Sequence, residues 1–151
     1  MPEFESRVTL PHKAEEVFDF LIRPAHLLQL IPPDAGMEVL NVPEVLELGS
    51  RLEFKITGFG QTLKLRHEVT ELIAPTKMTE TQLFGLFKTW THEHVIEPDS
   101  DGHVTLIDRI EFQPPGGLLG FVITKGKVLE QLDWVFDQRN QQIRKMLERP
   151  T

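Results

Sequence analysis

Two strand-like segments near the middle of the chain, residues 90–96 and 104–112, constrain its fold more than any other feature. In both segments apolar and polar residues alternate with a period of two, which is typical of strands with one buried and one solvated face. A short stretch rich in Asp, Ser and Gly separates them, so an antiparallel hairpin is predicted. A sheet of this kind must bury one of its faces against another element.

The predicted inward face of this hairpin also carries polar side chains. His92, His94 and Asp108 share that face with apolar residues such as Trp90 and Ile110. A polar group on a buried face costs free energy unless it finds a partner. These three residues are therefore expected either to satisfy one another or to line a cavity that holds water or a ligand.

Size and composition restrict the class of protein. A chain of 151 residues can bury a core as one domain, expected to span residues 1–151. The net charge of -7 disfavours nucleic acid or an anionic membrane surface as the main partner. With no cysteine, the chain has no disulfide, thiol catalysis or Cys-ligated metal. It has no run of about 18 apolar residues and its first residues lack a secretory-signal layout, so a cytoplasmic protein without stable membrane insertion is expected.

The remaining periodicities predict the order of the elements. Residues 2–10 form a first strand, and two short helices follow, one from Pro11 to Pro24 and one over 25–31. A long amphipathic helix ends the chain, with an apolar stripe that includes Val128, Leu132 and Phe136. The middle of the chain reads as six strands, with hairpin turns at 59–61 and 99–102: 37–44, 50–59, 61–73, 77–83, 88–96 and 103–112.

This order predicts an α+β fold. A strongly curved antiparallel sheet of about six to seven strands wraps around the C-terminal helix, with two short helices after the first strand. Curvature keeps the side chains from filling the interior completely, so a pocket between sheet and helix is expected.

The chain resembles the SRPBCC superfamily in its first strand, its Pro-rich pair of helices and two motifs. The motifs are Phe87-x-x-Trp90-x-His92-Glu93-His94 and Thr105-x-x-Asp108-Arg109-x-Glu111-x-x-Pro114-x-Gly116. This superfamily has the helix-grip fold of START domains and birch-pollen-allergen-type proteins, and the chain is most similar to its bacterial polyketide cyclase/dehydrase-like subgroup. The resemblance implies a cavity for a hydrophobic ligand and does not name the ligand.

The turns set the expected register of the polar residues. Centring the last hairpin on Ser100 gives three opposed pairs on the inward face: His92 with Asp108, His94 with Leu106, and Trp90 with Ile110. Centring the preceding turn near Leu86 places Glu80 opposite His92 and Gln82 opposite Trp90. Glu80, Gln82, His92, His94 and Asp108 then gather on one wall.

Three interpretations of this polar wall stay open. It is a buried network that fixes the sheet, an anchor that orients a ligand's carbonyl or hydroxyl, or a His92–Asp108 pair acting as general base. Two histidines spaced as His-x-His could also ligate a metal, but no second metal motif accompanies them, so neither metal nor other cofactor is predicted. His67 is expected to be a packed or rim histidine.

Arg139 falls on or beside the buried stripe of the last helix. Either its guanidinium extends to solvent while its stem packs, or it reaches a cavity carboxylate such as Glu80 or Asp108, or an acid group of the ligand.

The predicted function is binding of a small or mid-sized hydrophobic molecule, such as a lipid, polyketide or isoprenoid-like compound, by a carrier or sensor. An enzyme of the cyclase/dehydratase kind is the first alternative, and a protein-interaction module using apolar loops at 84–87 and 118–123 is the second. A homodimer stays open. The expected cavity wall is Phe54, Ile56, Leu65, Val69, Trp90, Leu106, Ile110, Leu132 and Phe136, with Glu80, Gln82, His92, His94, Asp108 and Arg139 as polar anchors.

Overall fold

The computed structural model describes residues 1–58, 60–99 and 102–148. Its secondary structure follows the periodicities of the sequence closely. The elements are β1 (Glu3–Leu10), α1 (Ala14–Leu21), α2 (Pro24–Leu30), the short 3-10 helix η1 (Pro33–Ala35), β2 (Met37–Asn41), β3 (Arg51–Gly58), β4 (Gln61–Ile73), β5 (Lys77–Phe84), β6 (Thr89–Pro98), β7 (Val104–Gln113), α3 (Leu119–Val122) and α4 (Lys125–Glu148).

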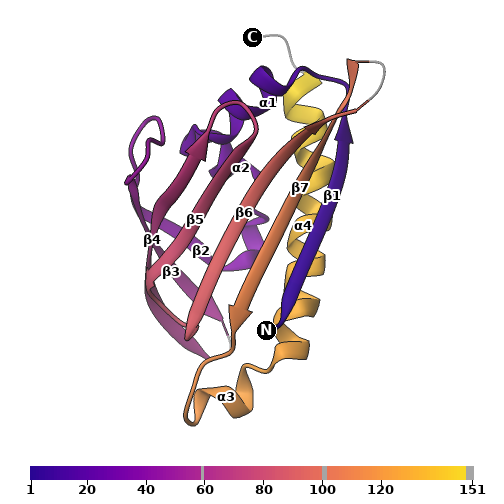
Figure 1. The fold of residues 1–151 in the computed structure, drawn as a ribbon. Helices are drawn as coiled ribbons and strands as arrows, with labels where there is room; N and C mark the ends of the chain where they lie inside the picture. The colour runs from indigo at the N-terminus through magenta and orange to yellow at the C-terminus, as the bar shows by residue number, and fades with distance from the viewer. Residues whose placement is uncertain (59, 100–101, 149–151) are drawn as a thin grey trace.

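The strands form one antiparallel sheet with the order β1-β7-β6-β5-β4-β3-β2. Consecutive strands from β2 to β7 pair with their neighbours in sequence, and β1 pairs with β7, so β1 and β2 are the two edges. Figure 1 shows the strongly twisted sheet with α4 running along its β1 edge. The predicted α+β helix-grip arrangement is confirmed.

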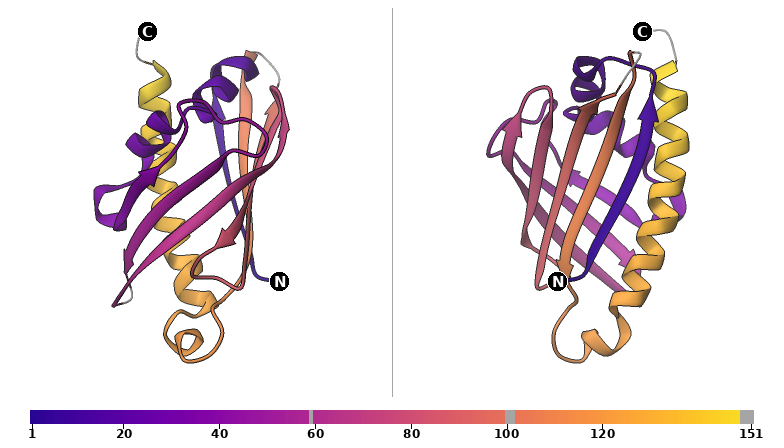
Figure 2. Two further views of the ribbon diagram at one scale, coloured as in Figure 1. Left: turned by 90° about the vertical axis from the view of Figure 1, so that its left-hand side faces the viewer. Right: turned by 45° about the vertical axis from the view of Figure 1, so that its right-hand side comes forward.

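Helix α4 lies against the concave side of the sheet, whereas α1 and α2 cover one end and α3 lies at the other (Figure 2). The face of α4 that contacts the sheet is the stripe predicted from its periodicity. Its buried residues are Val128, Leu132, Phe136, Arg139 and Ile143. No helix in the described part of the chain combines the length and the apolar character needed to cross a bilayer.

Element boundaries differ from the predicted ones at a few places. Strand β2 ends at Asn41, although the predicted strand ran to residue 44, because its pairing with β3 is broken by a bulge between Val39 and Asn41 and Pro43 has no N–H to continue the ladder. The hairpin turns predicted at 59–61 and 99–102 include residues 59, 100 and 101, which lie outside the described residues.

The register of the β6–β7 hairpin is shifted by two residues from the predicted one. His94 pairs with Asp108, His92 with Ile110 and Trp90 with Phe112. The predicted pairing of His92 with Asp108 is therefore wrong, because the ladder is centred one residue beyond Ser100, with Pro98 opposite Val104. A shift of two residues leaves every side chain on its predicted face, since the side chains of a strand alternate with a period of two.

On the other side of β6, Glu80 lies opposite His92, as predicted. The described β5–β6 ladder runs only to Thr81 and Thr91, so Gln82 and Trp90 do not form the predicted pair.

Three clusters of buried apolar side chains hold the fold together. One lies under α1 and α2 and includes Leu10, Leu21 and Leu106. A second joins the N-terminal half of α4 to the sheet, and a third packs the segment after β2 onto β3, β4 and β5. The space between these clusters is not filled.

Candidate functional site

A cavity of about 540 Å³ lies between the sheet and helices α2 and α4. Members of all three apolar clusters line it, among them Leu30, Leu52 and Phe136. The volume is within the range of about 300–1,000 Å³ in which small-molecule pockets fall. Twelve of the predicted site residues line this cavity: Phe54, Ile56, Leu65, Glu80, Gln82, Trp90, His92, His94, Ile110, Leu132, Phe136 and Arg139.

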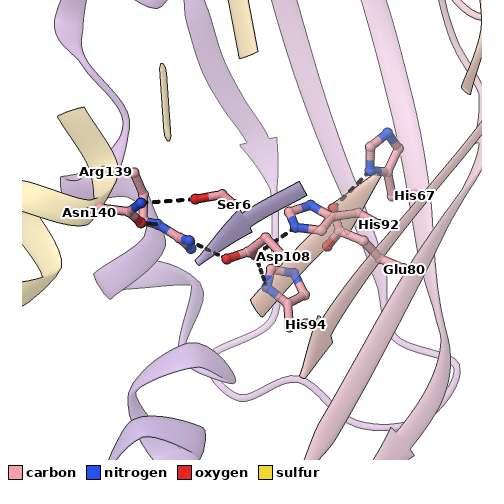
Figure 3. A network of polar contacts seen from close by, with 8 residues as sticks. All are labelled: Ser6, His67, Glu80, His92, His94, Asp108, Arg139 and Asn140. Carbon is pink, nitrogen blue, oxygen red and sulfur yellow. Dashed lines mark hydrogen bonds and ion pairs between the residues drawn. The ribbon is translucent and has the colours of Figure 1, made fainter. Parts of the chain in front are cut away.

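One wall of the cavity is polar. Because side chains alternate along a strand, His92 and His94 of β6 face the same side, and their rings stack with centroids 3.9 Å apart. Glu80 of β5 and His67 of β4 extend this wall toward the next strands. Figure 3 shows these side chains together with Asp108 and Arg139.

Asp108 is the centre of the polar network. Its side chain is fully buried, and its Oδ1 accepts a hydrogen bond from His92 Nε2 at 2.8 Å. Nδ1 of His94 lies 2.9 Å from the same oxygen, at an angle too poor for a hydrogen bond. Oδ2 accepts a hydrogen bond from Nη2 of Arg139 in α4. The carboxylate thus faces nitrogen atoms of three different residues, two of which donate hydrogen bonds to it.

These contacts keep Asp108 ionised. Burial alone raises the pKa of a carboxyl group, but the charge of Arg139 and the contacts with His94 and His92 hold the pKa of Asp108 well below its ordinary value. The pKa of His92 is lowered, first by its burial and then by the neighbouring His94, so His92 is neutral at physiological pH. An ionised carboxylate can only accept hydrogen bonds, and therefore Nε2 of His92 carries the proton.

A second pair, His67 and Glu80, lies beside this network. Nδ1 of His67 is 3.2 Å from Oε1 of Glu80, and both side chains are largely buried. Burial raises the pKa of Glu80, but the hydrogen bond and charge of His67, with smaller effects of His92 and His94, lower it to about 2. Glu80 is therefore an anion that accepts the proton of Nδ1.

Gln82 and Trp90 line the cavity in different ways. The Gln82 amide donates from Nε2 to the backbone oxygen of Phe87 at 2.7 Å, and its Oε1 accepts from Phe87 N at 3.4 Å. Gln82 therefore closes the β5–β6 turn. Trp90 stacks on Phe87, with ring centroids 4.7 Å apart, and supplies an aromatic surface to the cavity.

Solved structures share this architecture. Protein CV1439 from Chromobacterium violaceum has a TM-score of 0.74 at 18% identity over 99% of both chains. Ginseng major latex-like protein 151 from Panax ginseng has a TM-score of 0.62 at 15% identity over 93% of this chain and 95% of its own. The di-domain ARO/CYC StfQ from the steffimycin biosynthetic pathway has a TM-score of 0.70 at 17% identity over 97% of this chain and 50% of its own. The chain has the helix-grip fold.

The resemblance drawn from the two sequence motifs is thus confirmed at the level of fold. No protein-family model matches the sequence, and no curated protein does.

Within the helix-grip fold, two predicted wall residues lie away from the cavity. Leu106 is on the same face of the sheet as Asp108 but belongs to the fully buried cluster under α1. Val69 is packed against Met78 in the cluster beside β3. Both were placed by strand face alone, and the helices and the segment after β2 fill the space above them. Asp108 does not line the cavity either: it is fully buried and contacts His92 and His94, which do line it.

The structure decides between the alternatives for Arg139. Its guanidinium is buried and pairs with Asp108, and it also lies over the ring of Phe136, 4.7 Å from the centroid. Nε of Arg139 donates to Oδ1 of Asn140, whose amide in turn donates to Ser6 Oγ at 2.9 Å. Helix α4 is thereby joined to β7 and β1 through polar contacts.

Part of the cavity between the sheet and the helices was missed by reasoning from sequence. Residues of α2, η1 and β2, including Leu27, Leu28 and Met37, line one side of it. Leu28 and Met37 are also partly exposed, which identifies this side as a rim. His67 was expected to be a packed or rim histidine, and it is both buried and part of the cavity wall. Its position on one face with Leu63 and Leu65 was the available signal.

A metal ion is one further occupant to consider. One ligand atom each of His92, His94 and Asp108 lies within 4.8 Å of the others, the only such group among the described residues. However, Arg139 already neutralises Asp108, and both imidazoles direct a proton toward the carboxylate. A cation would have to displace the guanidinium and those protons, so the donor set fits a hydrogen-bond network better than a metal centre.

The two apolar loops, at 84–87 and 118–123, differ in whether their side chains line the cavity or are exposed. Leu86 and Phe87 line the cavity, whereas Leu118 and Phe121 at α3 are 86% and 82% exposed. Ile123 in the same segment is buried and anchors α3.

Proposed function

We propose that the chain, as a single domain over residues 1–151, binds a small or mid-sized hydrophobic molecule in this cavity and acts as a carrier or sensor in the cytoplasm. The observation that carries the proposal is an unfilled space of about 540 Å³ whose wall is mainly apolar with a few convergent polar groups. Burial of apolar ligand surface, at about 25 cal/mol per Å², supplies most of the affinity.

The proposal assigns two roles to the residues around the cavity. Phe54, Ile56, Ile110, Leu132 and Phe136 form the apolar surface, with Trp90 as an aromatic platform. His92, His94, Glu80 and Arg139 form the polar end that orients the ligand, and Asp108 positions the two imidazoles from behind. Gln82 shapes the wall by holding the β5–β6 turn.

The experiment uses Nile red, an uncharged dye whose fluorescence rises in an apolar environment. We expect saturable binding to the wild-type protein. Ile56→Trp fills part of the cavity and is expected to weaken binding at least ten-fold. Leu40→Trp is the matched control, because Leu40 is exposed on β2 and does not line the cavity. Equal affinity of both variants, or no binding to the wild type, would contradict the proposal.

An enzyme of the cyclase/dehydratase kind is the second candidate. It is favoured by one observation: the His92 imidazole, held by the buried Asp108, is neutral and available as a general base. StfQ, which shares the fold, is named as an ARO/CYC protein. The test is exchange of the methyl-ketone protons of 2-acetylnaphthalene for deuterium in D₂O. Catalysed exchange that His92→Ala abolishes supports an enzyme, and exchange at the buffer rate supports the carrier.

A protein-interaction module is the third candidate, and the exposed Leu118 and Phe121 favour it. The size of the cavity argues for the ligand-binding alternatives, because such a module needs no unfilled interior.

A further inference from the structure

In each imidazole of the polar wall, the contacts define which ring nitrogen is a hydrogen-bond donor and which is an acceptor. Nε2 of His92 donates to Asp108, and Nδ1 of His67 donates to Glu80. Nδ1 of His94 is 2.9 Å from an Asp108 oxygen without forming a hydrogen bond, and the negative charge of the carboxylate so close by favours an N–H group over a lone pair there, so this nitrogen also carries a proton. In a neutral imidazole one nitrogen is a donor and the other an acceptor. The carboxylates therefore fix which nitrogen of each ring is left as an acceptor.

The second nitrogens of these rings open onto the cavity. Among the described residues, the buried side-chain polar atoms without a hydrogen-bond partner are only His12 Nε2 and His94 Nδ1. Nδ1 of His92 and Nε2 of His94 are not in this group and make no hydrogen bond to the described protein, so they reach open space. The space that both rings line is the cavity. Oε2 of Glu80 is also not among those buried atoms and accepts no hydrogen bond from the described residues, so it faces the cavity as well.

The polar end of the cavity is thus a group of hydrogen-bond acceptors. Its two anions already have partners, since Asp108 pairs with Arg139 and Glu80 with His67. A ligand carboxylate would add a third anion beside Glu80 and would meet lone pairs on the imidazoles. A hydroxyl group can donate to these acceptors, and its oxygen can accept from N–H groups of Trp90 or Arg139, which also line the cavity.

From this order we infer that the site selects uncharged apolar molecules that bear a hydroxyl group, an alcohol or a phenol, and discriminates against carboxylates and ethers. The inference rests on the proposed function and specifies its ligand class. Discrimination of this kind is strong, because a ligand without the donor leaves buried acceptors unpaired.

The test measures displacement of Nile red by three matched biphenyls at neutral pH: biphenyl-4-ol, 4-methoxybiphenyl and biphenyl-4-carboxylate. We expect the phenol to bind about ten-fold more tightly than the ether, the effect of one hydrogen bond in an apolar site, and the carboxylate to bind more weakly than the ether. Nile red binding without displacement by any of the three overturns the inference, as does equal displacement by all three or strongest displacement by the carboxylate. Failure of Nile red itself to bind overturns the proposed function instead.

Variants separate hydrogen bonding from ligand size. His92→Phe removes one acceptor, and the ratio of phenol to ether affinity is expected to fall toward one. His26→Phe is the control, because His26 stacks on Phe20 and does not line the cavity, and its ratio is expected to equal that of the wild type. An unchanged ratio in His92→Phe contradicts the inference.

Nitrogen-15 NMR of the histidine rings tests the premise without any variant. The expected tautomers carry hydrogen on Nε2 in His92 and on Nδ1 in His94. The opposite tautomer in His92 would overturn the inference even if the protein binds Nile red.

Discussion

Arg139 of α4 forms an ion pair with Asp108 of β7 inside the protein, and this contact connects the helix to the sheet behind the polar wall of the cavity. Asp108 is fully buried, and Arg139 is the one Lys or Arg side chain paired with it among the described residues. The same carboxylate holds His92, so the fold and the binding site share one group.

Removing the arginine is expected to destabilise the protein. Arg139→Met leaves an uncompensated buried charge on Asp108, and we expect a loss of about 3 kcal/mol in the free energy of unfolding. Urea denaturation measures the loss. Arg144→Met, at an exposed position of the same helix, is the control and should stay within about 0.5 kcal/mol of the wild type. Equal stability of the two variants would show that the ion pair does not hold α4.

Acid is expected to destabilise the fold through Glu80. The pKa of Glu80 is about 2 in the folded protein against an ordinary 4.5, so the unfolded chain takes up this proton first. The corresponding stability, on the order of 3 kcal/mol, is present above about pH 4.5 and is lost as the pH falls toward 2. The lowered pKa values of Asp108 and His92 act in the same direction, that of His92 from about pH 6.5 downward.

Unfolding experiments at several pH values can isolate this contribution. Glu80→Gln is expected to show a flatter decline of stability between pH 4.5 and 2 than the wild type. Glu111→Gln, at an exposed position of β7, should retain the wild-type slope. A steep decline that Glu80→Gln leaves unchanged would assign the acid sensitivity to other groups.

Gly36 brings two backbone segments close together at the rim of the cavity. Its φ is +72°, and an added Cβ would overlap the carbonyl oxygen of Thr57. Gly36→Ala is therefore expected to cost more than about 1 kcal/mol of stability and to weaken Nile red binding. Gly126→Ala meets no neighbouring atom and should cost nothing, which thermal unfolding of both variants can compare. A fully stable Gly36→Ala would contradict this account of the rim.

The exposed tip at α3 is expected to be dispensable for ligand binding. Leu118 and Phe121 are almost fully exposed, so the double change Leu118→Ser/Phe121→Ser should alter stability by less than about 0.5 kcal/mol and leave Nile red affinity unchanged. A marked loss of affinity with stability intact would show instead that the tip covers the bound ligand.

The sequence was sufficient to predict which side chains face inward, but not how far the strands slide along one another. Period-two alternation placed His92, His94 and Asp108 on one face, whereas the register depended on the centre of a turn and was wrong by two residues. The contact between His92 and Asp108 survives, because a long side chain reaches the diagonal neighbour as well as the opposite one.

The sequence also could not show which inward-facing residues of a strand are covered by helices and which open onto the cavity. Leu106 shares its face with Asp108, yet α1 covers it, and only the packing of the helices could decide that. Helical periodicity placed Arg139 beside the buried stripe and left its partner open, since the choice depends on the distance across the sheet. The rim formed by α2, η1 and β2 joins segments whose contact no local pattern encodes.

The most direct test of the central claim is a methyl NMR titration of the wild-type protein with Nile red. If the dye binds between the sheet and α4, the largest shifts will come from Ile56, Ile110 and Leu132, while the exposed Leu40 and Leu48 stay unchanged. Shifts confined to Leu118 and Val122 at the tip, or no shifts at saturating dye, would contradict a ligand-binding cavity.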